Sequence, residues 1–209
     1  MTRRAGLWLA PFLLAAACGP TDPSPSPSPS VSPTPNACTG APSAYARTVT
    51  DWWVPRCSLE QDIYNDPQKA VGPPDAAGFG PNDFTGFVSL GFGGRVTVDL
   101  GGCLSDRPGA DLRVFQAVSS EWVSVYVSPS RDGPFTLLEA RKSCGIRVDA
   151  VKGYCDFDFA DAGVTQARYV RVEDGELFPC PGGTRSEGAD LDAVQALGVA
   201  TGALDSPLR

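Results

Sequence analysis

The fold class is decided by residues 87–100, which read Phe87-Val88-Ser89-Leu90-Gly91-Phe92-Gly93-Gly94-Arg95-Val96-Thr97-Val98-Asp99-Leu100. After the glycines, polar and apolar residues alternate from 95 to 100, which is the period of a strand with one buried face. The three glycines predict a tight turn, because larger side chains would clash or need a disfavoured φ angle. Farther along, residues 190–197 carry apolar residues on both faces, which predicts a strand at the centre of a sheet.

Other alternating segments are separated by turns rich in Gly, Pro and Asp. They span residues 44–53, 111–116, 121–128, 135–138, 154–159 and 168–173. Residues 59–77 and 101–109 are predicted to be loops. No segment after the N-terminal signal has convincing helical periodicity. About eight short strands therefore predict an all-β fold, an antiparallel β-sandwich or jelly roll, over residues 37–199.

Residues 1–17 have the pattern of a secretory signal peptide, with two arginines before a short apolar stretch. The stretch ends in Leu14-Ala15-Ala16-Ala17-Cys18 and resembles the lipobox of bacterial lipoproteins. The resemblance implies lipidation of Cys18 and an extracytoplasmic, lipid-anchored protein, held at the outer membrane if the host is Gram-negative. The alternative is an ordinary signal peptide that leaves Cys18 as a spare thiol.

Residues 18–36 are predicted to be a tether between this lipid anchor and the folded module. The segment is mostly Pro and Ser, so it cannot bury enough apolar surface to offset its ordering entropy. Alternating prolines favour polyproline II, at ~3.1 Å per residue, which makes a semi-rigid spacer on the order of 50 Å long. Residues 200–209 are predicted to be a flexible tail. No segment approaches transmembrane length.

Composition excludes several functional classes. The chain has 17 basic and 24 acidic residues, a net charge of −7, and no basic cluster, so no nucleic-acid partner is predicted. It has no histidine, so a Ser/His/Asp or Cys/His catalytic device is impossible and no enzymatic activity is predicted. Membrane contact is predicted only through the lipid anchor.

The exported part carries six cysteines besides Cys18, which predicts three disulfides. Six cysteines allow fifteen pairings, so the sequence does not settle the connectivity. Nearness in sequence favours Cys38 with Cys57 and Cys144 with Cys155, which leaves Cys103 with Cys180. A zinc site is the alternative, but the sequence has neither a histidine nor a CxxC pair.

Seven short motifs occur in a characteristic order. They are Tyr45-Ala46, Lys69-Ala70-Val71-Gly72-Pro73-Pro74-Asp75, Val88-Ser89-Leu90-Gly91-Phe92-Gly93-Gly94-Arg95-Val96, Asp111-Leu112-Arg113-Val114-Phe115, Val127-Ser128 with Asp132-Gly133-Pro134-Phe135, Tyr169-Val170-Arg171-Val172, and Gly188-Ala189-Asp190-Leu191-Asp192-Ala193-Val194. Together they resemble a family of bacterial cell-surface modules related to the galactose-binding-like, discoidin-type jelly rolls. The resemblance implies an eight-stranded jelly roll without catalysis, often with a structural calcium near the loops at one end. Discoidin-type domains often supply a Glu ligand from the last strand, where this chain has Gln195.

Four aspartates, Asp66, Asp75, Asp190 and Asp192, are the candidate calcium ligands. Carboxylates in loops suit a hard cation such as calcium, and Asp190 and Asp192, two apart in a strand, share one face. The alternative is that Asp66 and Asp75 form Asx turns beside prolines.

Three tryptophans are candidate ligand contacts, since a sugar face could stack on Trp52, Trp53 or Trp122. The alternative is that these rings pack under a loop or within the second sheet. The predicted function is a surface-displayed binding or adhesion module, with carbohydrate as the candidate ligand. The alternative is a structural envelope protein that docks a partner protein and binds no glycan.

Overall fold

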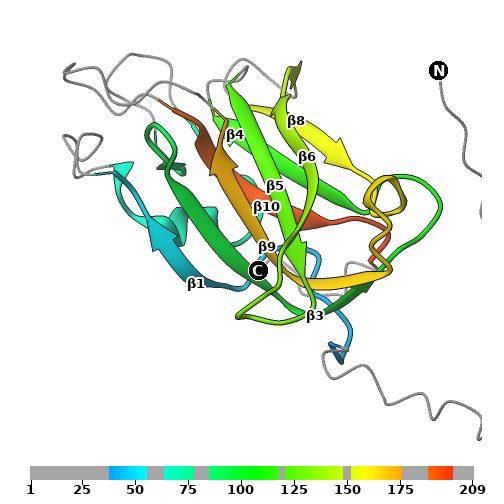
Figure 1. Ribbon diagram of the computed structural model, residues 1–209. Helices are drawn as coiled ribbons and strands as arrows, with labels where there is room; N and C mark the ends of the chain where they lie inside the picture. The colour runs from blue at the N-terminus through cyan, green and yellow to red at the C-terminus, as the bar shows by residue number, and fades with distance from the viewer. Residues whose placement is uncertain are drawn as a thin grey trace, which may run out of the picture. The chain divides into compact units, whose positions relative to one another are not determined.

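The computed structural model describes residues 38–55, 64–77, 85–117, 121–147, 152–175 and 188–199. They form two five-stranded sheets that pack face to face, with every strand pair antiparallel (Figure 1). The front sheet contains, in spatial order, β1 (Thr48–Trp53), β3 (Arg95–Ser105), β9 (Gln166–Asp174), β5 (Trp122–Ser128) and β6 (Thr136–Ser143). The back sheet contains β2 (Val88–Ser89), β10 (Asp190–Ala196), β4 (Leu112–Ala117), β8 (Lys152–Phe157) and β7 (Ile146–Arg147).

The predicted fold class, an antiparallel β-sandwich of the jelly-roll kind, is confirmed. The first four strands alternate between the sheets, because β1 and β3 lie in front and β2 and β4 lie behind. The central position predicted for the last strand is also confirmed, since β10 lies between β2 and β4. The only helices in the described part are the short 3-10 turns η3 (Pro67–Ala70) and η4 (Ala160–Ala162). None of its helices is long and apolar enough to cross a membrane.

The core lies between the sheets and is built from the inward side of each alternating strand. The front sheet contributes valines at 96, 98, 123, 125, 127, 170 and 172, all at most 1% exposed, and the back sheet faces them with Val88, Leu112, Val114, Leu191 and Val194. Burying one such side chain stabilises the fold by about 1.5–3 kcal/mol. The predicted tight turn after β2 is confirmed, because a Cβ atom on Gly94 would lie 1.8 Å from the carbonyl oxygen of Leu90.

Strand β3 is longer than the sequence predicts, because it continues through Gly101 and Gly102 to Ser105. The N-terminal segment lies along this extension. Ser43 N donates to the carbonyl of Leu100, and Cys103 N donates to the carbonyl of Gly40. A Cβ atom on Gly102 would lie 2.1 Å from the carbonyl oxygen of Ala41. These glycines therefore allow close backbone approach within a strand.

The same contact explains a wrong prediction about the disulfides. Cys38 is bonded to Cys103, with a Cα–Cα distance of 5.3 Å, so the predicted pairings of Cys38 with Cys57 and of Cys103 with Cys180 are both wrong. The N-terminal segment lies along β3, and this contact, rather than nearness in sequence, determines the partner of Cys38. The predicted bridge between Cys144 and Cys155 is confirmed, at a Cα–Cα distance of 4.4 Å.

Several predictions concern residues outside the described ranges. They are the signal peptide at 1–17, the tether at 18–36 with the lipidated Cys18, the tail at 200–209, and the cysteines Cys57 and Cys180.

Candidate functional site

A bulge in β1 shapes one wall of a polar hollow on the outer face of the front sheet. Val49 pairs with Val98 and Asp51 pairs with Thr97, so Thr50 is the extra residue between two regular pairs. Bulges of this kind re-aim side chains. Because of this bulge, Val49 and Trp52 both pack on the core although they are three residues apart, while Thr50 and Asp51 both line the hollow.

The floor of the hollow comes from the two neighbouring strands. Thr97 of β3 pairs in register with Arg171 of β9 and shares its outward face. Arg171 Nε donates to Thr97 Oγ1 at 3.2 Å. The guanidinium carbon of Arg171 also lies 4.0 Å from the ring centroid of Phe135, which is a cation–π contact. Two neighbours therefore fix the plane of this guanidinium.

The far wall is the connection between β5 and β6, which contributes Arg131, Asp132 and Phe135. Residues 130–133 form a turn, in which Gly133 N donates to the carbonyl of Ser130 at 3.2 Å. Arg131 reaches β1, where a terminal nitrogen donates to the carbonyl of Thr50 at 3.3 Å. The connection therefore spans β9 and β3 and closes the hollow from the side.

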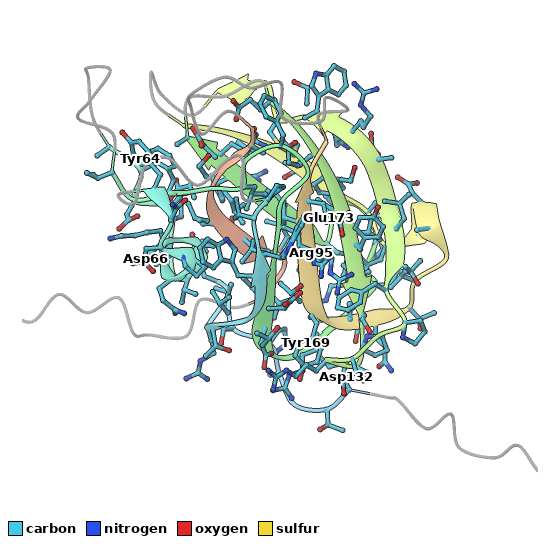
Figure 2. All side chains as sticks on the ribbon, turned by 60° about the vertical axis from the view of Figure 1, so that its left-hand side comes forward. Tyr64, Asp66, Arg95, Asp132, Tyr169 and Glu173 are labelled. Carbon is cyan, nitrogen blue, oxygen red and sulfur yellow. A yellow bond between two sulfur atoms is a disulfide. The ribbon has the colours of Figure 1, made fainter. Side chains whose placement is uncertain are left out.

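The resulting cavity has a volume of about 430 Å³ and is open to solvent. Its lining consists of Thr50, Asp51, Thr97, Arg131, Asp132, Phe135 and Arg171. Figure 2 shows Asp132 toward the lower end of the molecule, near Tyr169, while Arg95 and Glu173 lie above it. Hydroxyl, carboxylate and guanidinium groups thus surround one space beside one aromatic ring.

Of the four charged side chains that line this hollow, one forms an ion pair and three do not within the described part of the chain. Asp51 forms an ion pair with Arg95, whose Nε lies 3.3 Å from Asp51 Oδ2. Arg95 itself is outside the lining of the hollow. Within the described part of the chain, Arg131, Asp132 and Arg171 form no ion pair. These three charged side chains can therefore contact a ligand without first breaking an ion pair.

The three predicted aromatic contacts do not line this hollow. Trp52 is half-buried against the core, opposite Val96, so its ring faces inward. Trp53 is 49% exposed at the edge strand, where Arg95 lies 5.7 Å from its ring. Trp122 is 42% exposed on β5, with Arg141 at 5.5 Å. No comparable signal in the sequence points to Phe135, because its place in the hollow depends on the β5–β6 connection crossing two strands.

The predicted metal ligands serve different structural purposes. Asp192 is buried in β10, and its Oδ1 accepts hydrogen bonds from the backbone N–H of Asp75 at 2.9 Å and of Ala76 at 3.2 Å. The exposed Asp66 caps η3, because its Oδ1 accepts a bond from Gln68 N. No three of the four predicted aspartates bring carboxylate oxygens within 4.8 Å of one another in the described structure. These four aspartates therefore do not form a single carboxylate cluster in the described structure.

Asp190, the fourth of these residues, lies beside buried carboxylates at the start of β10. Burial raises the pKa of Asp190 to about 7, and repulsion from the Asp174 carboxylate adds to the rise. Asp174 itself accepts hydrogen bonds from Gly93 N and Ala189 N, both at 2.9 Å. These carboxylates join the turn after β2 to the segment that enters β10.

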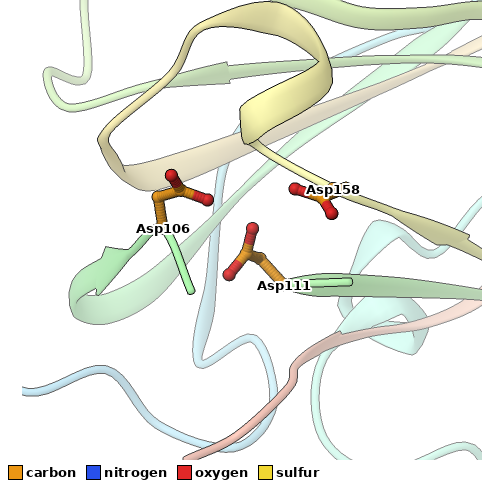
Figure 3. Close-up of side chains that lie close together, drawn as sticks. All are labelled: Asp106, Asp111 and Asp158. Carbon is orange, nitrogen blue, oxygen red and sulfur yellow. The ribbon is translucent and has the colours of Figure 1, made fainter. Parts of the chain in front are cut away.

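A second acidic cluster, not predicted from the sequence, lies where β3 ends and β4 begins. Carboxylate oxygens of Asp106, Asp111 and Asp158 lie within 4.8 Å of one another (Figure 3). Buried Asp111 accepts hydrogen bonds from Arg107 N at 3.0 Å and Phe159 N at 2.9 Å. Burial raises the pKa of Asp111, and the charges of Asp106 and Asp158 raise it further. Both Asp111 oxygens are thus used to hold neighbouring loops.

Comparison with known proteins does not assign the chain to a family. No protein family, curated protein or solved structure matches the chain.

Proposed function

We propose that the protein is a cell-surface binding module that recognises a carbohydrate in the hollow of the front sheet. One observation carries the proposal: hydrogen-bond donors, acceptors and an aromatic ring converge in one open cavity of about 430 Å³. Small-molecule sites typically measure roughly 300–1,000 Å³. The cavity therefore has room for one or two sugar rings.

The lining suits sugar hydroxyls, because each hydroxyl both donates and accepts hydrogen bonds. Asp132 offers acceptors only, and Arg131 and Arg171 offer donors only. The Thr50 hydroxyl donates to the carbonyl of Thr97 at 3.2 Å, so it offers a ligand its acceptor lone pair. The guanidinium carbon of Arg171 lies 4.0 Å from the ring centroid of Phe135, and both side chains border the same space. A polyhydroxylated ligand could satisfy all of these groups together.

The predicted lipid anchor and the β-sandwich fold support the same proposal. Residues 18–36 would hold the module away from a membrane to which Cys18 is lipid-anchored. The β-sandwich is the architecture implied by the resemblance to galactose-binding-like modules, and membership of that group is part of the proposal. Since a fold does not imply a function, it is the hollow itself that supports carbohydrate binding. We propose binding without catalysis, because a chain without histidine has no Ser/His/Asp or Cys/His device.

A glycan array tests this function. We expect the purified protein to retain a defined set of glycans, and Asp132→Ala to lose most of that signal. Lys69→Gln, at an exposed position on η3, is the control that should bind as the wild type does. A signal that survives Asp132→Ala would place the site elsewhere. The complete absence of glycan binding would favour the alternative, a structural protein that docks a partner protein.

A further inference from the structure

The two arginines in the hollow, Arg131 and Arg171, differ from the arginines that are paired with aspartates. Arg95, Arg113 and Arg168 are each bonded to an aspartate, at 3.3, 2.7 and 2.8 Å. Arg131 and Arg171 have no carboxylate partner in the described part of the chain, although acidic residues outnumber basic ones by 24 to 17. Two guanidinium groups without a counterion therefore line the same cavity.

Both guanidinium groups are held in place by neutral partners. Arg171 Nε donates to the hydroxyl of Thr97, and its guanidinium carbon lies 4.0 Å from the ring centroid of Phe135, which leaves its terminal nitrogens for a ligand. One terminal nitrogen of Arg131 donates a hydrogen bond to the carbonyl of Thr50. A guanidinium fixed in this way loses little conformational entropy when it binds an anion, and its fork matches the two oxygens of a carboxylate.

The nearby carboxylates do not cancel this positive charge. Asp51 is already paired with Arg95, so Asp132 is the remaining acid of the lining beside Arg131 and Arg171. The remaining acid, Asp132, repels a bare anion but accepts hydrogen bonds from hydroxyl groups. The cavity therefore favours a ligand that carries an anionic group and hydroxyl groups on one frame.

We infer that the hollow selects a sugar that carries a carboxylate, a uronic acid unit of an acidic polysaccharide. Arg131 and Arg171 bind the carboxylate, and Asp132 and Thr50 bind ring hydroxyls. This inference rests on the proposed carbohydrate-binding function and specifies its ligand class. It predicts affinity that falls as salt is added, because the contact is charge-assisted and partly exposed to solvent.

Calorimetric titration with matched ligands tests the inference. The ligands are trimers of galacturonate, glucuronate and mannuronate, each compared with its own methyl ester, which keeps the ring and the hydroxyls but removes the charge. We expect at least one free acid to bind about tenfold or more tightly than its ester, which is the size of one charge-assisted contact. Arg131→Gln and Arg171→Gln should each remove this preference, and Lys69→Gln, which makes the same change of charge outside the hollow, should keep it.

The other outcomes separate the inference from the proposed function. Equal binding of acid and ester, or binding of neutral glycans alone, would overturn the inference and leave the carbohydrate-binding function standing. Inorganic sulfate or phosphate that competes as well as the uronate trimer would show a general anion site and would also overturn it. If no glycan binds in the array or the calorimeter, both fail. The melting curves of the two arginine variants must match that of the wild type, which shows that a loss of binding is not caused by unfolding.

Discussion

The backbone N–H of Asp75 donates to Oδ1 of Asp192 at 2.9 Å, although the two residues are 117 positions apart. The bond joins the loop before β2 to the buried middle of β10. The same oxygen also accepts a hydrogen bond from Ala76 N. Asp192 is therefore a structural clamp between the first long loop and the last strand.

Loss of this clamp should destabilise the fold. Asp192→Ala leaves two backbone donors without their acceptor, and each such loss costs about 1–3 kcal/mol, so we expect the free energy of unfolding to fall by roughly 2–6 kcal/mol. Urea denaturation measures the change. Asp66→Ala is the contrast, because loss of its exposed cap should cost at most about 1 kcal/mol. Equal effects of the two substitutions would contradict the clamp.

Calcium removal tests the metal site predicted from the sequence. A calcium ion at ~100 times its dissociation constant would add about 2.7 kcal/mol to the free energy of unfolding. Because the four predicted ligands do not converge, we expect calcium and chelator to give melting temperatures within about 2 °C of each other. A larger drop in chelator that Asp75→Asn abolishes would show that this residue does bind a cation.

The buried Asp190 predicts a dependence of stability on pH. Its pKa rises from 3.8 to about 7 on folding, so between these values the folded state keeps a proton that the unfolded state releases. Stability should therefore fall as the pH rises through this window, by up to about 4 kcal/mol in full.

Asp190→Asn removes this penalty. Relative to the wild type, the variant should gain stability progressively from pH 4 to pH 7, and the gain should then level off. Melting curves at pH 4.5, 6 and 7.5 measure the difference. A difference that is the same at every pH would show that Asp190 titrates normally.

The disulfides are tested by peptide mapping without reduction. We expect one linked peptide pair that contains Cys38 and Cys103 and another that contains Cys144 and Cys155. If all six cysteines are oxidised within one chain, Cys57 and Cys180 form the third pair. The Cys144–Cys155 bridge closes a short loop, so its loss should cost roughly 3 kcal/mol. A peptide linking Cys38 to Cys57 would contradict the structure.

Much of the fold follows from local sequence patterns. The valines of β5 and of β3 alternate strictly, and alternation fixes which face is buried because successive side chains in a strand point to opposite sides. The apolar character of β10 on both faces correctly placed it inside a sheet. The extension of β3 through Gly101 and Gly102 was missed, because glycine marks a turn by propensity and a close backbone contact only in the folded structure.

The candidate site was harder to predict, because non-local pairing creates it. The bulge at Thr50 changes the phase of β1, so Trp52 faces the core and a threonine reaches the hollow. Arg131 and Arg171 meet only because the β5–β6 connection crosses two strands, and no spacing in the sequence reports that crossing. Composition indicated a binding module, but it directed attention to tryptophans.

Mapping of ligand-induced amide chemical shifts tests the central claim most directly. The ¹⁵N-labelled protein is titrated with the strongest glycan ligand from the array, and the shifted amides are located on the sandwich. The account predicts that the largest shifts fall at Thr50, Asp51 and Thr97, on residues 131–135, and at Arg171, which together surround the hollow. Shifts that instead centre on Trp122, or on the loop at residues 64–77, would contradict it.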